Sequence, residues 1–159
     1  MEWYWGRYVS AGEKRAKAAR TLEKLQKRDT HIAPVTIQGR KIVKSFWGKA
    51  WCKHLEKFSD YENRLPRGRM YVRNGSVCHL AITPKQIEAK VSGTSLYNVR
   101  IEIAPLSAAK WRSVKKQCAG GIGSILELLE GQLSEKVMAV VTHREKGLFP
   151  QPREIKLSC

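Results

Sequence analysis

The sequence predicts an α+β fold, in which a four- to five-stranded antiparallel sheet has helices packed on one face and is preceded by a basic N-terminal helix. Three observations support this prediction. Residues 13–28 contain good helix formers without Gly or Pro, an aromatic stripe with helical spacing follows near residue 50, and residues 70–103 alternate with period two. A chain of 159 residues, 42% of them hydrophobic, is long enough to bury a core.

The predicted N-terminal helix, residues 12–28, is strongly basic. Its apolar stripe is narrow and consists of Ala18, Leu22 and Leu25. Basic residues occupy most of its other positions, namely Lys14, Arg15, Lys17, Arg20, Lys24, Lys27 and Arg28. So few apolar side chains predict weak packing, and a helix that stays mobile until a partner neutralises its charge.

A second helix is predicted after Ser45, which is a suitable N-cap residue. Trp47, Trp51, Leu55 and Phe58 follow at spacings of four, four and three residues, which places them on one helical face. Because large apolar side chains at such spacing usually face the interior, we interpret both tryptophans as core residues.

The strands are predicted from turn residues flanked by alternating sequence. Three pairs of residues mark hairpin turns, namely Gln38-Gly39, Asn74-Gly75 and Ser92-Gly93. Helices over residues 107–118 and 124–133 are expected to follow, with a last strand over residues 153–157.

The net charge is the most unusual property of the composition. The chain has 30 Lys and Arg against 14 Asp and Glu, which gives a net charge of +16. This imbalance favours nucleic acid as the partner and makes an acidic membrane surface a weaker alternative. The sequence has neither an apolar run of about 20 residues nor the apolar core of a signal peptide, so we expect a cytoplasmic protein without a membrane partner.

The candidate nucleic-acid site is a cluster of arginines between residues 64 and 73. Pro66 and Gly68 predict an exposed, bent loop that leads into a hairpin, and Tyr71 is placed to stack on a base. The guanidinium fork suits phosphate oxygens, although the arginines could instead pair with Asp60 and Glu62 and only hold the loop. The predicted phosphate contacts are Arg64, Arg67, Arg69 and Arg73, with Lys14, Arg15, Lys17 and Arg20 from the basic helix.

The residue pattern favours neither catalysis nor a disulfide framework. His31 and His143 are isolated, and most carboxylates lie three or four residues from a lysine, so we expect a protein that is not an enzyme. The histidines next to Cys52 and Cys78 lie on different faces from those thiols and are poor metal ligands. The widely spaced cysteines are Cys52, Cys78, Cys118 and Cys159.

The strings FWGKAWC, YENRLPRGRMYVRNGSV, VSGTSLYNV and GLFPQPREIKLSC, in this order, resemble the bacterial and archaeal SWIM zinc finger family proteins. The resemblance extends from about residue 37 to the end of the chain. It implies a zinc motif of the form Cys-x-Cys followed by Cys-x-His, in which Cys159 matches the first ligand. Because the other three ligands have no counterpart, we expect an incomplete, truncated site and no stoichiometric zinc in this chain, although the full-length family binds zinc.

The residue pattern and the resemblance together lead us to expect a division of the chain and a function. The expected parts are an aromatic N-terminus with a basic arm at 1–34, an α+β domain at 35–152 and the start of the zinc finger at 153–159. SWIM modules bind nucleic acid and protein and occur beside Swi/Snf-type helicase ATPases. We therefore expect a non-catalytic nucleic-acid-binding protein, DNA or RNA, with an adaptor for such an ATPase as the alternative.

Overall fold

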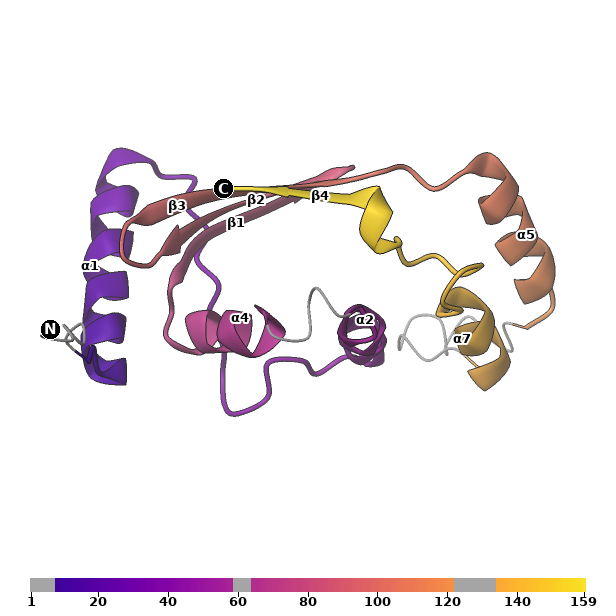
Figure 1. The fold of residues 1–159 in the computed structure, drawn as a ribbon, viewed down its shortest axis with the longest axis horizontal. Helices are drawn as coiled ribbons and strands as arrows, with labels where there is room; N and C mark the ends of the chain where they lie inside the picture. The colour runs from indigo at the N-terminus through magenta and orange to yellow at the C-terminus, as the bar shows by residue number, and fades with distance from the viewer. Residues whose placement is uncertain (1–7, 59–63, 122–133) are drawn as a thin grey trace, which may run out of the picture. The chain divides into compact units, whose positions relative to one another are not determined.

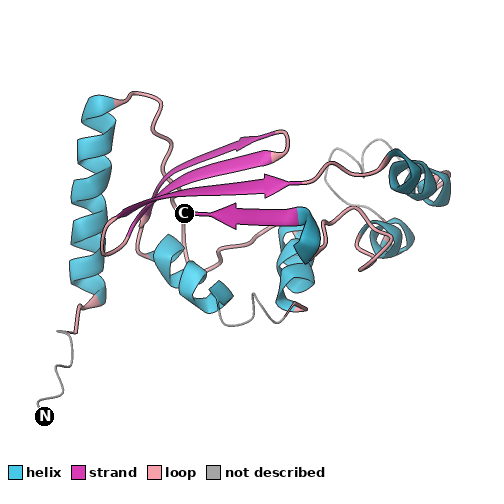
Figure 2. Cartoon of the chain, turned by 45° about the horizontal axis from the view of Figure 1, so that its top comes forward, coloured by secondary structure: helices cyan, strands magenta, loops and turns pink. Residues whose placement is uncertain are grey.

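The computed structural model describes residues 8–58, 64–121 and 134–159, which form an α+β fold (Figure 1). The sheet has four strands in the order β1-β2-β3-β4, and Figure 2 shows it together with the helices. The predicted fold class is therefore confirmed. The strands are β1 Val77–Thr83, β2 Gln86–Ser92, β3 Leu96–Ile103 and β4 Ile155–Ser158.

The chain divides into two compact units. The first contains the described parts of 1–42, 64–101 and 157–159, and the second contains those of 43–63 and 102–156. The helices of the first unit are α1 Ala11–Arg28 and α4 Arg64–Arg73. Those of the second are α2 Phe46–Glu56, α5 Ala108–Cys118, α7 Glu135–Val141 and the 3₁₀ turn η1 Pro152–Glu154.

The basic helix α1 begins with a capping box. The backbone N–H of Glu13 donates to Ser10 Oγ at 3.2 Å, and the N–H of Ser10 donates to Glu13 Oε2 at 2.8 Å. The helix lies across the end of β1 and β2 and buries Ala18 (2% exposed) against them (Figures 1 and 2). The helix that we expected to pack weakly therefore contacts the sheet through a narrow stripe of small and apolar residues.

The predicted hairpin around Asn74-Gly75 is wrong, and so is the predicted arginine loop, because residues 64–73 form α4. Gly75 has φ +67° and ends the helix: its N–H donates to Val72 O at 3.0 Å, while the N–H of Ser76 donates to Tyr71 O at 2.9 Å. This is the Schellman pattern, and it needs the same left-handed glycine as a hairpin turn. Pro66 is tolerated because it lies in the first helical turn.

The first hairpin of the sheet is instead formed by β1 and β2, the two strands that follow α4. β1 and β2 pair in antiparallel register, with Leu80 opposite Ala89, and they are joined at Pro84-Lys85, where Lys85 has φ +70°. The turn predicted at Ser92-Gly93 does join β2 to β3. The sequence therefore located the second hairpin but assigned the first strand of the sheet to residues that are helical.

Residues 35–42, predicted as a short hairpin, contain no strand. Instead this segment begins beside the edge of the sheet, where the N–H of Val35 donates to Val77 O at 3.0 Å. Just before it, Ala33 O accepts from the N–H of Leu80 at 2.9 Å. The open edge of β1 supplies the backbone partners that a local hairpin would otherwise have provided.

The second unit has an apolar cluster of Val114, Val137 and Val141, against which Trp47 packs. The predicted N-cap of α2 is confirmed, since Ser45 Oγ accepts from the N–H of Gly48 at 3.1 Å. The sequence did not predict α7. The helix predicted over residues 124–133 lies outside the described residues.

A group of aromatic rings in the same unit surrounds the buried His54. Trp51 stacks on His54 with ring centroids 6.3 Å apart, and Phe149 meets the Trp51 ring edge-on at 4.8 Å. His54 Nε2 lies 3.0 Å from Pro150 O, whereas its Nδ1 is buried without a hydrogen-bond partner. Trp47 and Trp51 are half-buried, so the aromatic face of α2 does pack against apolar side chains.

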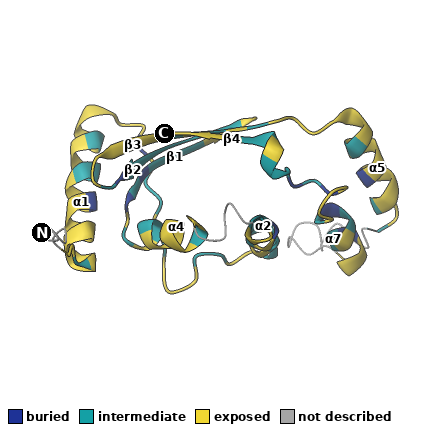
Figure 3. Cartoon of the chain, in the orientation of Figure 1, coloured by how far each residue is buried: buried dark blue, intermediate teal, exposed yellow. Residues whose placement is uncertain are grey.

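Most of α1 and α5 is exposed (Figure 3). Within the described residues, no helix combines the length and apolar character that crossing a membrane requires.

Candidate nucleic-acid interface

A cavity of about 310 Å³ lies in the first unit and is lined by residues from α1, α4 and the β2–β3 turn. We call it the basic pocket. Its cationic residues are Lys14 and Lys17 from α1 and Arg67 from α4. Its apolar residues are Val9, Met70 and Tyr71, and its remaining lining residues are Asn74, Ser76, Ser92, Gly93 and Thr94.

Helical spacing explains which residues of each helix face the pocket. Lys14 and Lys17 are three residues apart on α1, and Arg67 and Tyr71 are four apart on α4, so each pair shares a helical face. Among the residues that the structure describes, none that lines the pocket is acidic, and the three cations come from segments about 50 residues apart in sequence. Like charges around one concave surface create a field that attracts anions.

Hydrogen bonds at the β2–β3 turn fix one side of the pocket. Lys17 Nζ donates to Thr94 O at 2.8 Å, which holds one ammonium at the turn and leaves that ammonium two further protons to donate. Thr94 Oγ1 and Tyr97 OH are 2.5 Å apart. Hydrogen bonding from Thr94, and then from Ser95, lowers the pKa of Tyr97.

Gly93 leaves room for the Tyr97 ring at this turn. A Cβ on Gly93 would stand 2.6 Å from Tyr97 Cε2 and 3.5 Å from Tyr71 OH. The missing side chain therefore lets the Tyr97 ring pack on the turn and brings the Tyr71 hydroxyl close to it.

Two of the lining residues of the pocket are buried serines. Ser76 and Ser92 are only 4% and 6% exposed, and the N–H of Ser92 donates to Ser76 O at 2.8 Å. Ser92 Oγ donates to Thr21 Oγ1 at 3.2 Å, which ties α1 to the end of β2. Hydrogen bonds therefore connect this part of the lining to both the sheet and α1.

The structure separates the arginines that the sequence placed in one loop. Of the four, only Arg67 lines the basic pocket; Arg64 lies one turn earlier on the same helical face. Arg69 and Arg73 are four residues apart and share the opposite face, since residues two apart on a helix are about 200° apart. Of the predicted residues on α1, Lys14 and Lys17 line the pocket, whereas Arg15 and Arg20 are exposed outside it.

Sequence reasoning missed the residues that complete the pocket, including Val9, Ser76 and Thr94. Thr94 follows a turn that was recognised only as a hairpin signal, and Ser76 follows a glycine whose role was misassigned. The one local signal was the group of small residues at 92–95, three of which carry a hydroxyl. Such residues are common at turns whether or not the turn has a function.

A second groove, of about 630 Å³, lies on the polar face of the sheet. His79 pairs with Lys90 across β1 and β2, and Glu88 forms an ion pair of 2.9 Å with Arg100. Cys159 also lines this groove and is exposed. The described lining of this groove includes the acidic residues Asp29 and Glu88 as well as the basic residues Lys90 and Arg100. The groove therefore has no excess of positive charge comparable to that of the basic pocket.

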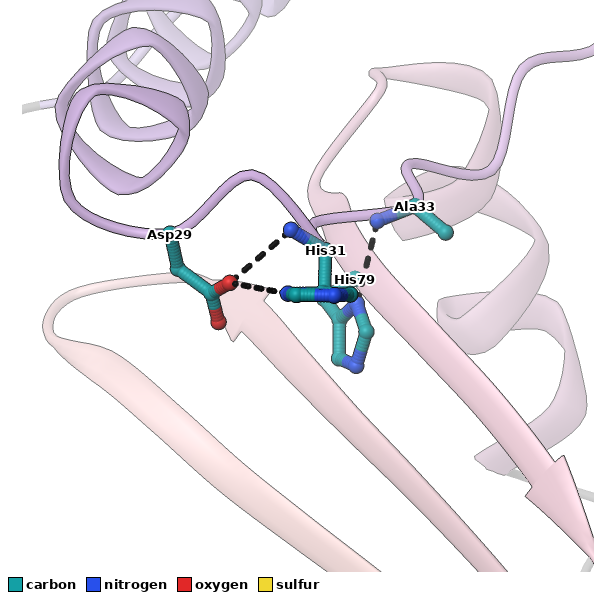
Figure 4. Close-up of polar contacts among 4 residues, drawn as sticks. All are labelled: Asp29, His31, Ala33 and His79. Atoms are coloured by element: carbon teal, nitrogen blue, oxygen red, sulfur yellow. Dashed lines mark hydrogen bonds and ion pairs between the residues drawn. The ribbon is translucent and has the colours of Figure 1, made fainter.

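Figure 4 shows the polar contacts at one side of this groove. Asp29 Oδ1 accepts from the N–H of His31 at 2.8 Å and lies 3.3 Å from His31 Nδ1. The first of these bonds is the main cause of the lowered pKa of Asp29. His79 Nδ1 accepts from the N–H of Ala33 at 3.1 Å, which occupies one of its two ring nitrogens.

The cysteines differ in exposure. Cys78 is fully buried, Cys52 and Cys118 are half-buried, and Cys159, the predicted zinc ligand, is exposed. Burial raises the pKa of Cys78. Among the residues that the structure describes, no three His, Cys, Asp or Glu side chains are grouped to hold a metal ion.

No family model and no solved structure matches this chain. Among curated proteins it is similar to "Uncharacterized protein Rv2102" of Mycobacterium tuberculosis, with 31% identity over 121 residues. The match covers 74% of this chain, which spans 43% of the length of that relative. The resemblance to the SWIM family therefore stays a prediction from the sequence.

Proposed function

We propose that this chain is a non-catalytic nucleic-acid-binding protein that contacts phosphate through the basic pocket. One observation carries the proposal: Lys14, Lys17 and Arg67 converge on one cavity, and none of the described residues that line it is acidic. The net charge of +16 supports it, because a field of this sign attracts polyanions over long distances.

The three cations suit phosphate in complementary ways. The planar guanidinium of Arg67 can donate two parallel hydrogen bonds to phosphate oxygens, and the two lysine ammonium groups supply compact charge. Contacts of this kind bind the backbone and carry no sequence information by themselves. We therefore expect affinity that depends steeply on salt and weakly on base sequence.

The exposed cations outside the pocket have a different role in this proposal. Arg15, Arg20 and Arg73 add to the general field and steer the approach of the nucleic acid, whereas the pocket makes the direct contacts. The two groups can be compared because α1 and α4 contain members of both.

The test is fluorescence anisotropy with a labelled oligonucleotide of about 12 nucleotides, over roughly 50 to 200 mM salt. The triple variant Lys14→Ala/Lys17→Ala/Arg67→Ala loses three direct contacts. We expect the slope of log K against log salt to fall by about 2 to 3 units.

The matched control is Arg15→Ala/Arg20→Ala/Arg73→Ala, which removes the same charge from the same two helices. We expect its slope to change by less than about 1 unit, because distant cations release few counterions. Equal slopes for the two variants would remove the pocket from the proposal. Unchanged binding of the pocket variant at every salt concentration would refute it.

A further inference from the structure

We infer that the basic pocket takes a single unpaired nucleotide, with its phosphate at the cations and its base against the apolar lining, so that the chain prefers single-stranded to duplex nucleic acid. This inference rests on the proposed function and specifies its ligand. It requires two properties of the pocket: an apolar surface beside the charge, and a volume that suits one nucleotide and is too small for a base pair with its backbone.

The apolar surface lies directly beside the cations. Met70 and Tyr71 come from the same helix as Arg67, and Val9 precedes α1. Met70 is 55% and Val9 44% exposed, so large apolar side chains face solvent at a strongly basic site. Pure backbone binding needs no such surface, whereas a base has an apolar face that stacks on aromatic side chains such as Tyr71.

The volume fits one nucleotide. About 310 Å³ is at the lower limit of pockets that hold small organic ligands, so the cavity has room for one nucleotide but not for a folded segment of nucleic acid. Asn74 and Thr94 add amide and hydroxyl groups to the lining, and these can donate to or accept from a base edge.

The size of the pocket excludes a paired base. The buried Ser76 and Ser92 form part of the lining, and a cavity of about 310 Å³ has no room for a base pair with its backbone. A base within a duplex is stacked and paired, and its removal costs a few kcal/mol of unstacking, whereas an unpaired base is free to enter. Duplex binding then relies on surface cations alone.

The first experiment uses the unmodified chain and a labelled single strand, displaced by unlabelled competitors. A nucleoside 5′-monophosphate should displace the strand at lower concentration than either inorganic phosphate or the free nucleoside, because only the nucleotide engages both surfaces. Equal potency of inorganic phosphate and the nucleotide would overturn the inference and leave an anion-binding pocket, and therefore the proposed function, intact.

The second experiment compares Tyr71→Ala and Tyr71→Phe on a single strand and on its duplex. Loss of the ring should weaken single-strand binding about 5- to 140-fold, the range of one base–aromatic stack, with little change for the duplex. Tyr71→Phe, which keeps the ring, should bind the single strand about as well as the parent chain does. A thermal melt shows whether each variant is folded. Equal losses on both nucleic acids, or no loss on either, would overturn the inference.

The two proposals fail in different ways. If the triple cation variant binds both nucleic acids as well as the parent does, the proposed function fails. If that variant loses affinity for both equally and Tyr71→Ala changes neither, the pocket is a backbone site and only the single-nucleotide inference fails.

Discussion

Cys78 in β1 and Ala18 in α1 meet at the contact between helix and sheet: Cys78 Sγ lies 3.9 Å from Ala18 O and 3.5 Å from its nearer acceptor, Ser76 O. Cys78 is fully buried and Ala18 is 2% exposed. Two small residues let the helix backbone approach the strand closely, so a helix with only a narrow apolar stripe can dock. This contact positions Lys14 and Lys17 relative to Arg67, and the basic pocket depends on it.

A larger residue at this contact should separate helix and sheet. Ala18→Leu is expected to lower the free energy of unfolding by about 1–3 kcal/mol, as overpacking of a filled interior does. The matched control is Ala19→Leu, one residue along on the exposed side of the helix. Urea unfolding measures both, and similar stabilities for the two variants would show that α1 does not dock as described.

Two glycines of the α4 region should respond to alanine in opposite directions. At Gly68 an added Cβ meets nothing within 4 Å and the residue is helical, so Gly68→Ala should stabilise by roughly 0.5–1 kcal/mol. At Gly75 φ is +67°, so Gly75→Ala should destabilise by roughly 1–2 kcal/mol. Thermal melts of the two variants test the assignment of this segment as a helix. Destabilisation by Gly68→Ala would favour the arginine loop instead.

The four thiols should react with a maleimide in order of exposure. Cys159 should label first, the half-buried Cys52 and Cys118 should follow, and Cys78 should label only on unfolding, because burial removes access and raises its pKa. Mass spectrometry of peptides from timed samples gives the order. Cys159→Ser removes the fast phase if this order is correct, and rapid labelling of Cys78 in that variant would show that α1 leaves the sheet.

Asp29 should contribute a pH-dependent part of the stability. Its pKa is lowered in the folded chain, chiefly by the hydrogen bond from the N–H of His31. This contribution is therefore present above the ordinary carboxyl value of 3.8 and is lost as the pH falls through the lower folded value. Urea unfolding from neutral to acid pH should show a shallower acid loss in Asp29→Asn than in the parent.

The control for this prediction is Glu23→Gln, which removes one negative charge from the same helix and breaks an exposed ion pair with Lys27. Its acid loss should follow that of the parent chain. If Asp29→Asn also follows the parent, the hydrogen bond to His31 contributes nothing measurable.

Local signals in the sequence determined much of the secondary structure. Serines at the start of α2 and α5 accept a backbone N–H as N-caps, which explains why both helices were predicted with nearly correct boundaries. The alternation through β2 and β3 and the turn at Ser92-Gly93 likewise depend on neighbours in the chain. The excess of positive charge, and hence the class of partner that it favours, is also fixed by composition alone.

Only the tertiary structure decided the first hairpin and the site. A left-handed glycine after Asn serves a hairpin turn and a helix end equally well, so Gly75 could not be assigned until the partners of its backbone were known. The pocket joins Lys17 to Arg67, about 50 residues apart, through the docking of α1 on the small side chain of Cys78. Sequence spacing carries information about neighbours on one helix or strand, whereas the convergence of α1 and α4 depends on the docking of α1 on the sheet and on the turn that connects α4 to β1.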